Sequence, residues 1–302
     1  MIGVCVPKDG GVSPTEILDT GARWVRFSAD QRHRQAEYAR DCHRAGLKVF
    51  VTLDSDSMIN FGTIDQMAAY YANTFTGWID AIGIGNEPDG TGAESSREGY
   101  NTLHAKARAL RREFGTTTVL VGPGLVSGDP GWLDGFDLSL VDAIDVHLYA
   151  SAPPDWQDKM TGYVDDKLHR YRVKLEELGQ PGMPIYMSEI GISSDETGEL
   201  RQAEYCLDMM TWADASGLVM ACWFAYHDWA GFGMVRDDGS PKPAYDAFRR
   251  AARWVPPVED RCEQFKQALA DILQYASTHN QKTMKRKSII EKAKRGLGMG
   301  VA

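Results

Sequence analysis

Short apolar runs alternate along this chain with longer stretches in which apolar residues recur at helical spacing. The apolar runs are rich in Val and Ile on both faces, which is typical of strands in a buried parallel sheet. They predict eight strands, at 2–6, 23–28, 47–53, 80–86, 118–123, 142–149, 184–190 and 219–226. Helical spacing predicts helices over 64–75, 95–114 and 160–178, and Ser13 followed by Pro14 marks the start of a first helix.

Glycines such as Gly46 and Gly179 punctuate this pattern, because each follows a helical stretch and precedes a strand. Eight β/α units favour a closed (β/α)8 TIM barrel of the α/β class over residues 1–255. The architectural alternative is an open doubly wound sheet, although no G-x-G-x-x-G follows the first strand to support a dinucleotide fold. A last helix over 241–254 completes the barrel.

The sequence changes character after Pro256 and Pro257, which break the chain. Residues 256–302 contain an amphipathic stripe and a basic end, so we expect a short helical C-terminal extension. The stripe is close to heptad spacing over two repeats, and this allows two alternatives: packing on the barrel, or self-association through the C-terminal helix.

Charge and composition narrow the classes of partner. The formal net charge is −9, and because residues 256–302 contain 9 Lys and Arg against 5 Asp and Glu, the remaining chain carries −13. Such an acidic body argues against a nucleic-acid substrate, which needs dense cationic contacts. The apolar runs are too short to cross a bilayer, so no membrane association is expected.

The cysteines and the N-terminus carry further expectations. The five cysteines form no C-x-x-C pair, so a zinc ribbon or a redox motif is not indicated. Met1 leads directly into an apolar run without a basic region or a long apolar stretch, and no signal peptide is visible. We therefore expect a cytoplasmic protein or one delivered by a non-classical route, including association with a virion.

Two glutamates follow apolar runs at the ends of predicted strands. Glu87 lies in Asn86-Glu87-Pro88 after the fourth strand, and Glu189 follows Ser188 near the end of the seventh. Catalytic groups of (β/α)8 barrels lie at the C-terminal ends of the strands. A carboxylate there is costly to bury unless it has a partner or a chemical role. The alternative is structural: each glutamate only pairs with an arginine and supports the fold. Two such glutamates at strand ends, one of them directly after Asn86, favour a catalytic role over this alternative.

These two motifs resemble the clan A retaining glycoside hydrolases, a group that includes many cellulases, xylosidases and mannanases. The resemblance covers residues 1–255 and implies that Glu87 is the acid/base, that Glu189 is the nucleophile and that Asn86 hydrogen-bonds the substrate 2-hydroxyl. It further implies a role in substrate binding, directly or through the nucleophile, for a set of strand-end residues. These are Arg26 beneath the nucleophile, His147 and Tyr149 lining the cleft, and Trp223 as the aromatic platform under the sugar.

The reaction expected from this resemblance needs no cofactor and no metal. Aromatic residues near the predicted C-terminal loops, Trp229 among them, provide faces on which a sugar ring can stack. An oligo- or polysaccharide with β-linkages is the expected substrate, cleaved through a covalent glycosyl-enzyme. Three other functions stay open: a non-catalytic carbohydrate-binding barrel in a surface or virion assembly, a barrel metallohydrolase, and a transglycosidase that uses the same glutamates.

Overall fold

The eight apolar runs form eight parallel strands in a computed structural model of the chain, and they close into a barrel in the order β1 to β8. The structure describes residues 1–7, 11–29, 35–53, 75, 77–90, 97–109, 118–149 and 160–253. The strands are β1 (Ile2–Cys5), β2 (Trp24–Ser28), β3 (Lys48–Leu53), β4 (Ala81–Ile84), β5 (Val119–Leu125), β6 (Ala143–His147), β7 (Ile185–Ile190) and β8 (Met220–Trp223). Pairing of β8 with β1 removes both sheet edges and confirms the predicted (β/α)8 barrel.

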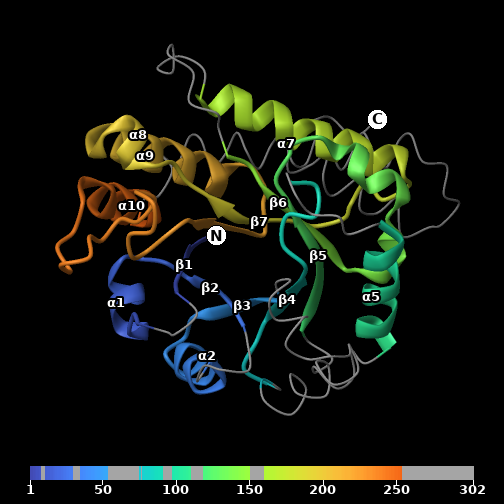
Figure 1. Ribbon diagram of the computed structural model, residues 1–302, viewed down its shortest axis with the longest axis horizontal. Helices are drawn as coiled ribbons and strands as arrows, with labels where there is room; N and C mark the ends of the chain where they lie inside the picture. The colour runs from blue at the N-terminus through green and yellow to red at the C-terminus, as the bar shows by residue number, and fades with distance from the viewer. Residues whose placement is uncertain are drawn as a thin grey trace, which may run out of the picture. The chain divides into compact units, whose positions relative to one another are not determined.

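Helices surround the strands when the barrel is seen as in Figure 1. They are α1 (Pro14–Asp19), α2 (Gln35–Arg44), α5 (Arg97–Ala109), α7 (Met160–Glu177), α8 (Ser194–Thr197), α9 (Glu199–Ala215) and α10 (Pro243–Arg253), with 3-10 turns η1 (Pro130–Gly135) and η2 (Leu138–Leu140). The predicted helices at 95–114, 160–178 and 241–254 correspond to α5, α7 and α10. Residues 64–74 of the predicted helix over 64–75 and the whole extension over 256–302 lie outside the described residues, so both predictions stay untested.

The first helix begins where its sequence predicts. Ser13 is the N-cap of α1, and its side chain accepts a hydrogen bond from the backbone of Glu16, whose carboxylate accepts one from Ser13 in return. This capping box satisfies two backbone donors that the helix itself leaves unpaired. Pro14 occupies the first turn, where no hydrogen bond from its nitrogen is needed.

Side chains of the strands divide into two apolar layers. An inner cluster takes residues from all eight strands and fills the barrel: Cys5, Trp24, Phe50, Ala81, Val121, Ala143, Tyr186, Met220, Cys222 and Ala225, the last just beyond β8. An outer cluster joins the alternate strand positions to the helices. Because the inner cluster fills the barrel, polar groups that face inward beyond it gather at one end of the strands.

Strand β7 changes phase in its middle, and this places two consecutive side chains inside the barrel. Ile185 and Met187 belong to the outer cluster before the change, and Ile190 and Ile192 belong to it afterwards. The pairing of β7 with both neighbours slips by one residue over the same stretch, as a β-bulge does. The extra residue allows Glu189 and the residue before it to face the interior together.

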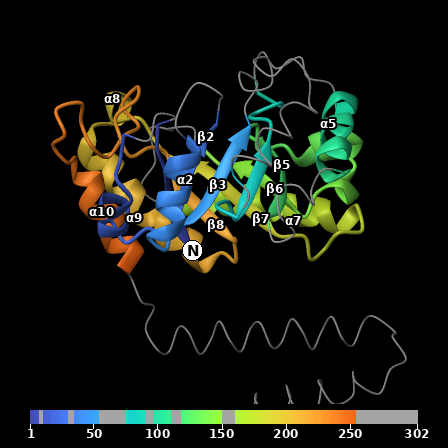
Figure 2. The same cartoon turned by 90° about the horizontal axis from the view of Figure 1, so that it is seen from below.

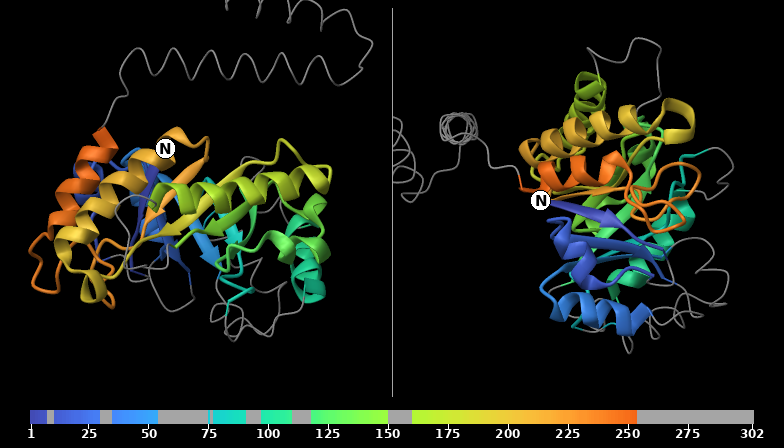
Figure 3. Two further views of the ribbon diagram at one scale, coloured as in Figure 1. Left: turned by 90° about the horizontal axis from the view of Figure 1, so that it is seen from above. Right: turned by 90° about the vertical axis from the view of Figure 1, so that its left-hand side faces the viewer.

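The two ends of the barrel differ in what they present. In Figure 2 the strands β2 and β3 point toward the end on which α8 lies, whereas the N-terminus lies at the opposite end. Figure 3 shows α10 ending on the N-terminal side, away from the loop that joins β8 to α10. Loops at the C-terminal end are therefore free to form a site.

Among the described residues, no helix combines the length and the apolar character needed to span a membrane.

Candidate active site

The two glutamates of the sequence prediction face one another at the C-terminal end of the barrel. Glu87 follows β4 and Glu189 lies on β7, and a carboxylate oxygen of each lies within 4.8 Å of the other and of a ring nitrogen of His147. Their surroundings differ, because 33% of the Glu87 side chain is exposed against 8% of that of Glu189. One carboxylate is therefore open to solvent and the other is enclosed.

The backbone holds Glu87 in an unusual conformation. Its φ angle is +50°, in the left-handed region that non-glycine residues rarely adopt, and its N–H donates to the carbonyl of Gly124 at 2.8 Å. Two residues further on, the carboxylate of Asp89 accepts hydrogen bonds from the N–H groups of Val126 and Ser127. The chain after β4 is thus tied to the chain after β5, and this aims Glu87 into the mouth.

Glu189 is held as a carboxylate by two donors. Arg26 of β2 forms an ion pair with its Oε1, and the hydroxyl of Tyr149 donates to its Oε2 at 2.7 Å. Burial by itself raises the pKa of Glu189, but the charges of Arg26 and then His147, together with the Tyr149 hydrogen bond, lower the pKa overall. Glu189 is consequently ionised at neutral pH and has fixed partners on both oxygens.

The side chain of Arg26, on β2, also hydrogen-bonds a residue of β3 and a residue that follows β4. Its Nε donates to the hydroxyl of Thr52 on β3 at 3.0 Å, and one terminal nitrogen donates to Oδ1 of Asn86 at 3.0 Å. Burial opposes the charge of Arg26, but Glu189 raises the pKa of the guanidinium above its ordinary value. Oδ1 of Asn86 is therefore the acceptor in this contact, and the amide nitrogen is the donor end of the side chain.

His147 is buried between the two carboxylates. Its Nδ1 lies 2.8 Å from Oε1 of Glu87 and 3.7 Å from Oε2 of Glu189, and its Nε2 lies 3.0 Å from the hydroxyl of Ser188. Burial lowers the pKa of the ring, but the charge of Glu189, the nearby carboxylate of Asp145 and the hydrogen bond to Glu87 raise it to about 10. The carboxylates around His147 therefore favour the protonated form of its ring.

Two buried polar residues of the site carry no signal in the motif pair and were missed. Asp145, on β6 two positions before His147, accepts hydrogen bonds from the N–H of Ser188 at 2.9 Å and from its hydroxyl at 2.6 Å. The period of two along β6 was the available signal, because positions 143, 145 and 147 all face the interior. Regular alternation allows only one of Ser188 and Glu189 to face inward, and the bulge that brings both inside leaves no mark in the sequence pattern.

The structure corrects the expectation that Trp223 is the aromatic platform. Its side chain is fully buried in the outer cluster, with its ring centroid 6.1 Å from that of Tyr205 on α9. Cys222 occupies the preceding inward position, and alternation along the strand then turns the indole outward. A side chain without exposed surface cannot stack on a sugar, so the platform role does not belong to Trp223.

The inward aromatic residue at this end of β8 is Phe224, which follows the strand. Its ring contacts those of Trp229 and Phe232 at centroid distances of 5.7 and 5.8 Å, and Phe232 contacts Tyr149 at 6.0 Å. We call Phe224, Trp229 and Phe232 the aromatic wall. Because Tyr149 bonds Glu189, the wall begins beside the enclosed carboxylate, and its outermost ring, Trp229, is 66% exposed.

The loop that carries the wall is fixed by a buried lysine. Nζ of Lys242 lies 2.7 Å from the carboxylate of Asp228 and 2.9 Å from the hydroxyl of Ser194, and the lysine is only 4% exposed. The other carboxylate oxygen of Asp228 accepts from the N–H of Gly233 at 3.0 Å. Along the chain, Asp228 and Gly233 flank Trp229 and Phe232, and the contact of Lys242 with Ser194 holds the loop against α8.

Glu87, His147 and Glu189 are the described residues whose side-chain atoms are grouped closely enough to consider a metal ion. The donor set does not suit one. His147 would have to give up a proton that Glu189 and Asp145 stabilise, and a cation between the glutamates would face the guanidinium of Arg26. The site already holds two cationic side chains beside the glutamates, those of Arg26 and protonated His147.

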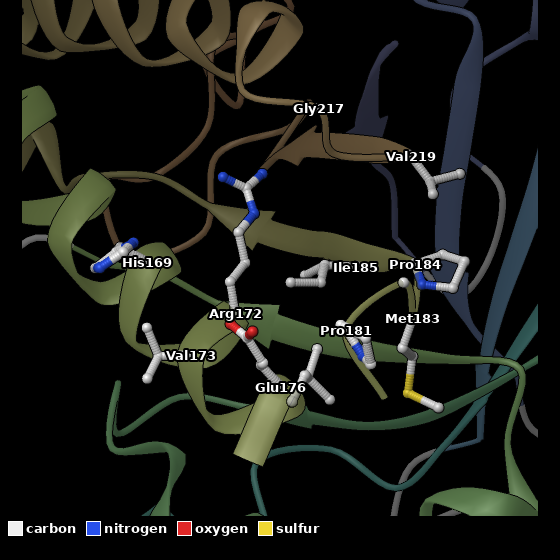
Figure 4. A pocket seen from close by; sticks show the side chains of 12 residues that line it. His169, Arg172, Val173, Glu176, Pro181, Met183, Pro184, Ile185, Gly217 and Val219 are labelled. Carbon is white, nitrogen blue, oxygen red and sulfur yellow. The ribbon is translucent and has the colours of Figure 1, made fainter. Parts of the chain in front are cut away.

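A pocket lies at the other end of the barrel, where β7 and β8 begin. Figure 4 shows His169, Arg172 and Glu176 of α7 on one side of it, and Pro184 and Val219 on the other. Arg172 donates to the backbone carbonyl of Ser216. This pocket is at the N-terminal end of the strands, where side chains of (β/α)8 barrels serve stability rather than chemistry.

The protein is therefore a closed (β/α)8 barrel whose candidate site holds two facing glutamates, at the C-terminal ends of β4 and β7. Solved structures similar to the chain include a family 39 glycoside hydrolase from Bacteroides cellulosilyticus WH2 (TM-score 0.66, 16% identity, 83% of this chain and 63% of that one). A GH128 endo-β-1,3-glucanase from Amycolatopsis mediterranei is similar too (TM-score 0.58, 21% identity, 82% and 98%). So is a β-xylosidase from Caulobacter crescentus CB15 (TM-score 0.62, 16% identity, 84% and 68%).

These likenesses establish the fold. The chain spans less than two thirds of the length of the family 39 enzyme and nearly the whole length of the endo-β-1,3-glucanase. No protein-family model matches the sequence, and no curated protein matches it. The argument for activity therefore depends on the site itself.

Proposed function

We propose that this protein hydrolyses O-glycosidic bonds in a β-linked glycan with retention of anomeric configuration, with Glu189 as nucleophile and Glu87 as acid/base. One observation carries the proposal: the two carboxylates approach within 4.8 Å, one enclosed and ionised, the other open to solvent. Retaining glycosidases hold their carboxyl groups about 5 Å apart, whereas inverting enzymes need room for an intervening water.

In the first step, the ionised Glu189 attacks the anomeric carbon while Glu87 gives its proton to the departing oxygen. The bond from Glu189 to carbon forms as the glycosidic bond breaks, and the leaving sugar departs as an alcohol. Arg26 and Tyr149 hold both Glu189 oxygens, so the nucleophile is oriented before the substrate arrives. The product of this step is a glycosyl ester of Glu189.

In the second step, Glu87 takes a proton from water, and the water oxygen attacks the anomeric carbon of the ester. The bond to Glu189 breaks, its carboxylate is restored beside Arg26, and Glu87 regains the proton it lost. Two inversions at one carbon give net retention. A sugar hydroxyl in place of water would make the same residues a transglycosidase.

Substrate binding draws on the donors and rings that surround the pair. Because the oxygen of Asn86 accepts from Arg26, its amide nitrogen is the end of the side chain that can donate to a sugar hydroxyl. The aromatic wall offers Trp229 to the apolar face of a sugar ring. The similar solved structures include enzymes named for β-linked substrates, among them β-1,3-glucan and β-xylosides, and this favours a β-linked glycan.

The test is a panel of aryl β-glycosides and β-linked polysaccharides, with Glu189→Ala as the control. Proton NMR of the first product anomer reports the stereochemistry, and a fluorinated sugar trapped on Glu189 would be seen by peptide mass spectrometry. Glu87→Ala should slow substrates with poor leaving groups far more than activated aryl glycosides. An inverted anomer would refute the retaining mechanism, and saturable sugar binding without turnover would identify a carbohydrate-binding barrel instead.

A further inference from the structure

Beneath the two glutamates lie two polar side chains to which the proposed reaction assigns no task. Asp145 and Ser188 are 2% and 0% exposed, and they form a short chain of contacts with His147. The hydroxyl of Ser188 is 2.6 Å from Oδ2 of Asp145 and 3.0 Å from Nε2 of His147. Buried carboxylates are costly, so Asp145 needs a function that offsets its burial.

The direction of each hydrogen bond in this chain follows from a count of protons. A carboxylate only accepts, so the single hydroxyl hydrogen of Ser188 points to Asp145. Its oxygen must then accept from His147, which places a hydrogen on Nε2. The opposite ring nitrogen, Nδ1, lies 2.8 Å from Oε1 of Glu87, and it donates to this oxygen both when Glu87 is a carboxylate and when Glu87 carries its proton on Oε2.

We propose that Asp145 and Ser188 are positioning residues that keep both ring nitrogens of His147 protonated, so that His147 always donates to Oε1 of Glu87. The catalytic proton of Glu87 is then carried by Oε2, the oxygen that remains for the substrate. This inference rests on the proposed function for the role of Glu87, but the protonation of His147 can be measured without a substrate.

The backbone supports this arrangement from two sides. The bulge of β7 turns Ser188 and Glu189 inward together, and the N–H of Ser188 also donates to Asp145 at 2.9 Å, which fixes the aspartate. On the β5 side, Gly124 presents only backbone, and a Cβ at this position would overlap the ring of His147. The ring therefore has one place to lie.

Different neighbouring carboxylates stabilise the protonated ring of His147 in the two steps of the reaction. The charged groups that face the ring are Glu87 after β4, Glu189 on β7 and Asp145 on its own strand, and β5 contributes only the backbone of Gly124 among the described residues. When Glu189 becomes an ester, its charge disappears. Asp145 then holds the proton on His147, and Nδ1–H of the ring continues to donate to Oε1 of Glu87 while Glu87 activates water. The pKa of His147, raised to about 10, agrees with this geometry.

An isosteric substitution of Asp145 reverses the direction of the hydrogen bonds that join residue 145, Ser188 and His147. In Asp145→Asn, the side-chain oxygen can keep the Ser188 N–H, and the amide nitrogen then donates to the Ser188 hydroxyl. The hydroxyl hydrogen must turn toward Nε2 of His147, which has to lose its proton to accept it. The tautomer of His147 is therefore set by one atom of residue 145.

The first experiment is nitrogen NMR of the histidine rings in the full chain, with the His147 signals identified by their loss in His147→Gln. We expect both nitrogens of His147 to be protonated from pH 6 to about 8 in the unchanged protein, and Nε2 to become unprotonated in Asp145→Asn. A neutral His147 at pH 7 in the unchanged protein, or no change in Asp145→Asn, would overturn the inference whether or not the protein is a glycosidase.

The second experiment is kinetic and uses an aryl glycoside identified by the substrate panel. Asp145→Asn should lower the rate of the second step by about tenfold to a hundredfold, the effect of one charge-assisted hydrogen bond, and the first step less. The aryl alcohol should then appear as a burst, and the basic limb of the kcat profile should move to lower pH. Ser188→Ala should show the same pattern more weakly, and Ser188→Thr, which restores a hydroxyl, should recover part of the rate.

The matched control is Thr118→Val, which removes a buried hydroxyl that donates to the carbonyl of Ile79 far from the glutamates. It should lower thermal stability without a burst or a shifted pH profile. If Asp145→Asn loses activity in the same way as this control, with an unmoved pH profile and equal slowing of both steps, Asp145 is only structural. If the unchanged protein cleaves nothing in the panel, the proposed function fails while the NMR result still decides the protonation of His147.

Discussion

The ring of His147 fills the space that a side chain at Gly124 would occupy. A Cβ on Gly124 would overlap Nε2 of the ring, whereas a Cβ on Gly122, two residues earlier on β5, would find its nearest neighbours at 3.7 Å. β5 and β6 can therefore approach closely only because residue 124 is a glycine. The position of Glu87, the proposed acid/base, depends in turn on the ring of His147 that lies beside this glycine.

Gly124→Ala should displace His147 and slow turnover at least tenfold, because Glu87 loses the donor that orients it. Overpacking of this kind also costs stability, on the order of 1–3 kcal/mol. The matched control is Gly122→Ala, which has room for the methyl group and should leave kcat within about twofold. Rate measurements and thermal unfolding of both variants test this, and equal activity of the two would contradict it.

Arg26→Gln should damage both stability and catalysis, since it leaves Glu189 buried without its cation. Removal of one partner of a buried pair typically costs about 3–5 kcal/mol. The double variant Arg26→Gln with Glu189→Gln should recover a large part of this loss, because it removes the uncompensated charge. Urea unfolding of both single variants and the double variant measures the coupling, and simple additivity would argue against the pair.

The pH dependence follows from the lowered pKa of Glu189. Because the folded protein favours the ionised form, the stability contributed by Glu189 is fully present above the ordinary pKa of a glutamate. It is lost as the pH falls through the lowered folded-state value. Activity that requires ionised Glu189 should fall over the same acidic range, and Arg26→Gln should move this acid limb to higher pH. A pH profile of kcat/KM for both proteins checks the direction of the shift.

The two tryptophans near β8 should separate stability from binding. Trp223→Ala removes a fully buried indole and should cost about 3–5 kcal/mol of stability. Trp229→Ala removes a side chain that is 66% exposed and should change stability by less than about 0.5 kcal/mol. Its effect should appear instead as a raised KM for oligosaccharides. The opposite result, a binding defect in stable Trp223→Phe, would restore the platform role to Trp223.

Lys242→Met should loosen the loop that carries the aromatic wall. The substitution keeps most of the side-chain volume but removes the charge that pairs with Asp228 and the donor to Ser194. We expect a rise in KM similar to that of Trp229→Ala and faster proteolysis between β8 and α10, with a smaller effect on kcat. A variant with an unchanged cleavage rate and unchanged KM would show that the loop is held by its other contacts.

Much of the barrel could be predicted from the sequence because its elements repeat. Each strand is an apolar run on both faces, and all eight appear within a few residues of their predicted ends. The positions of Glu87 and Glu189 followed from the same regularity, since strand ends of a closed barrel converge. Arg26, Asn86, His147 and Tyr149 lie around them for the same reason.

The errors arose where the regular alternation was misjudged or interrupted. Trp223 was assigned to the cleft by resemblance, although the inward position of Cys222 sets the opposite phase. Ser188 was missed because the bulge in β7 is invisible in the apolar pattern. Both cases concern which way a side chain faces, a property that a shift of one residue inverts.

The bulge of β7 also restricts how the chain can change in length. Before it, odd-numbered residues such as Met187 point to the helices, and after it even-numbered ones such as Ile190 do. Deletion of one residue between them would restore perfect alternation, but only one inward side chain would remain where Ser188 and Glu189 now lie together. A deletion at this point of β7 therefore costs the site one of its two inward groups even where the rest of the barrel keeps its alternation.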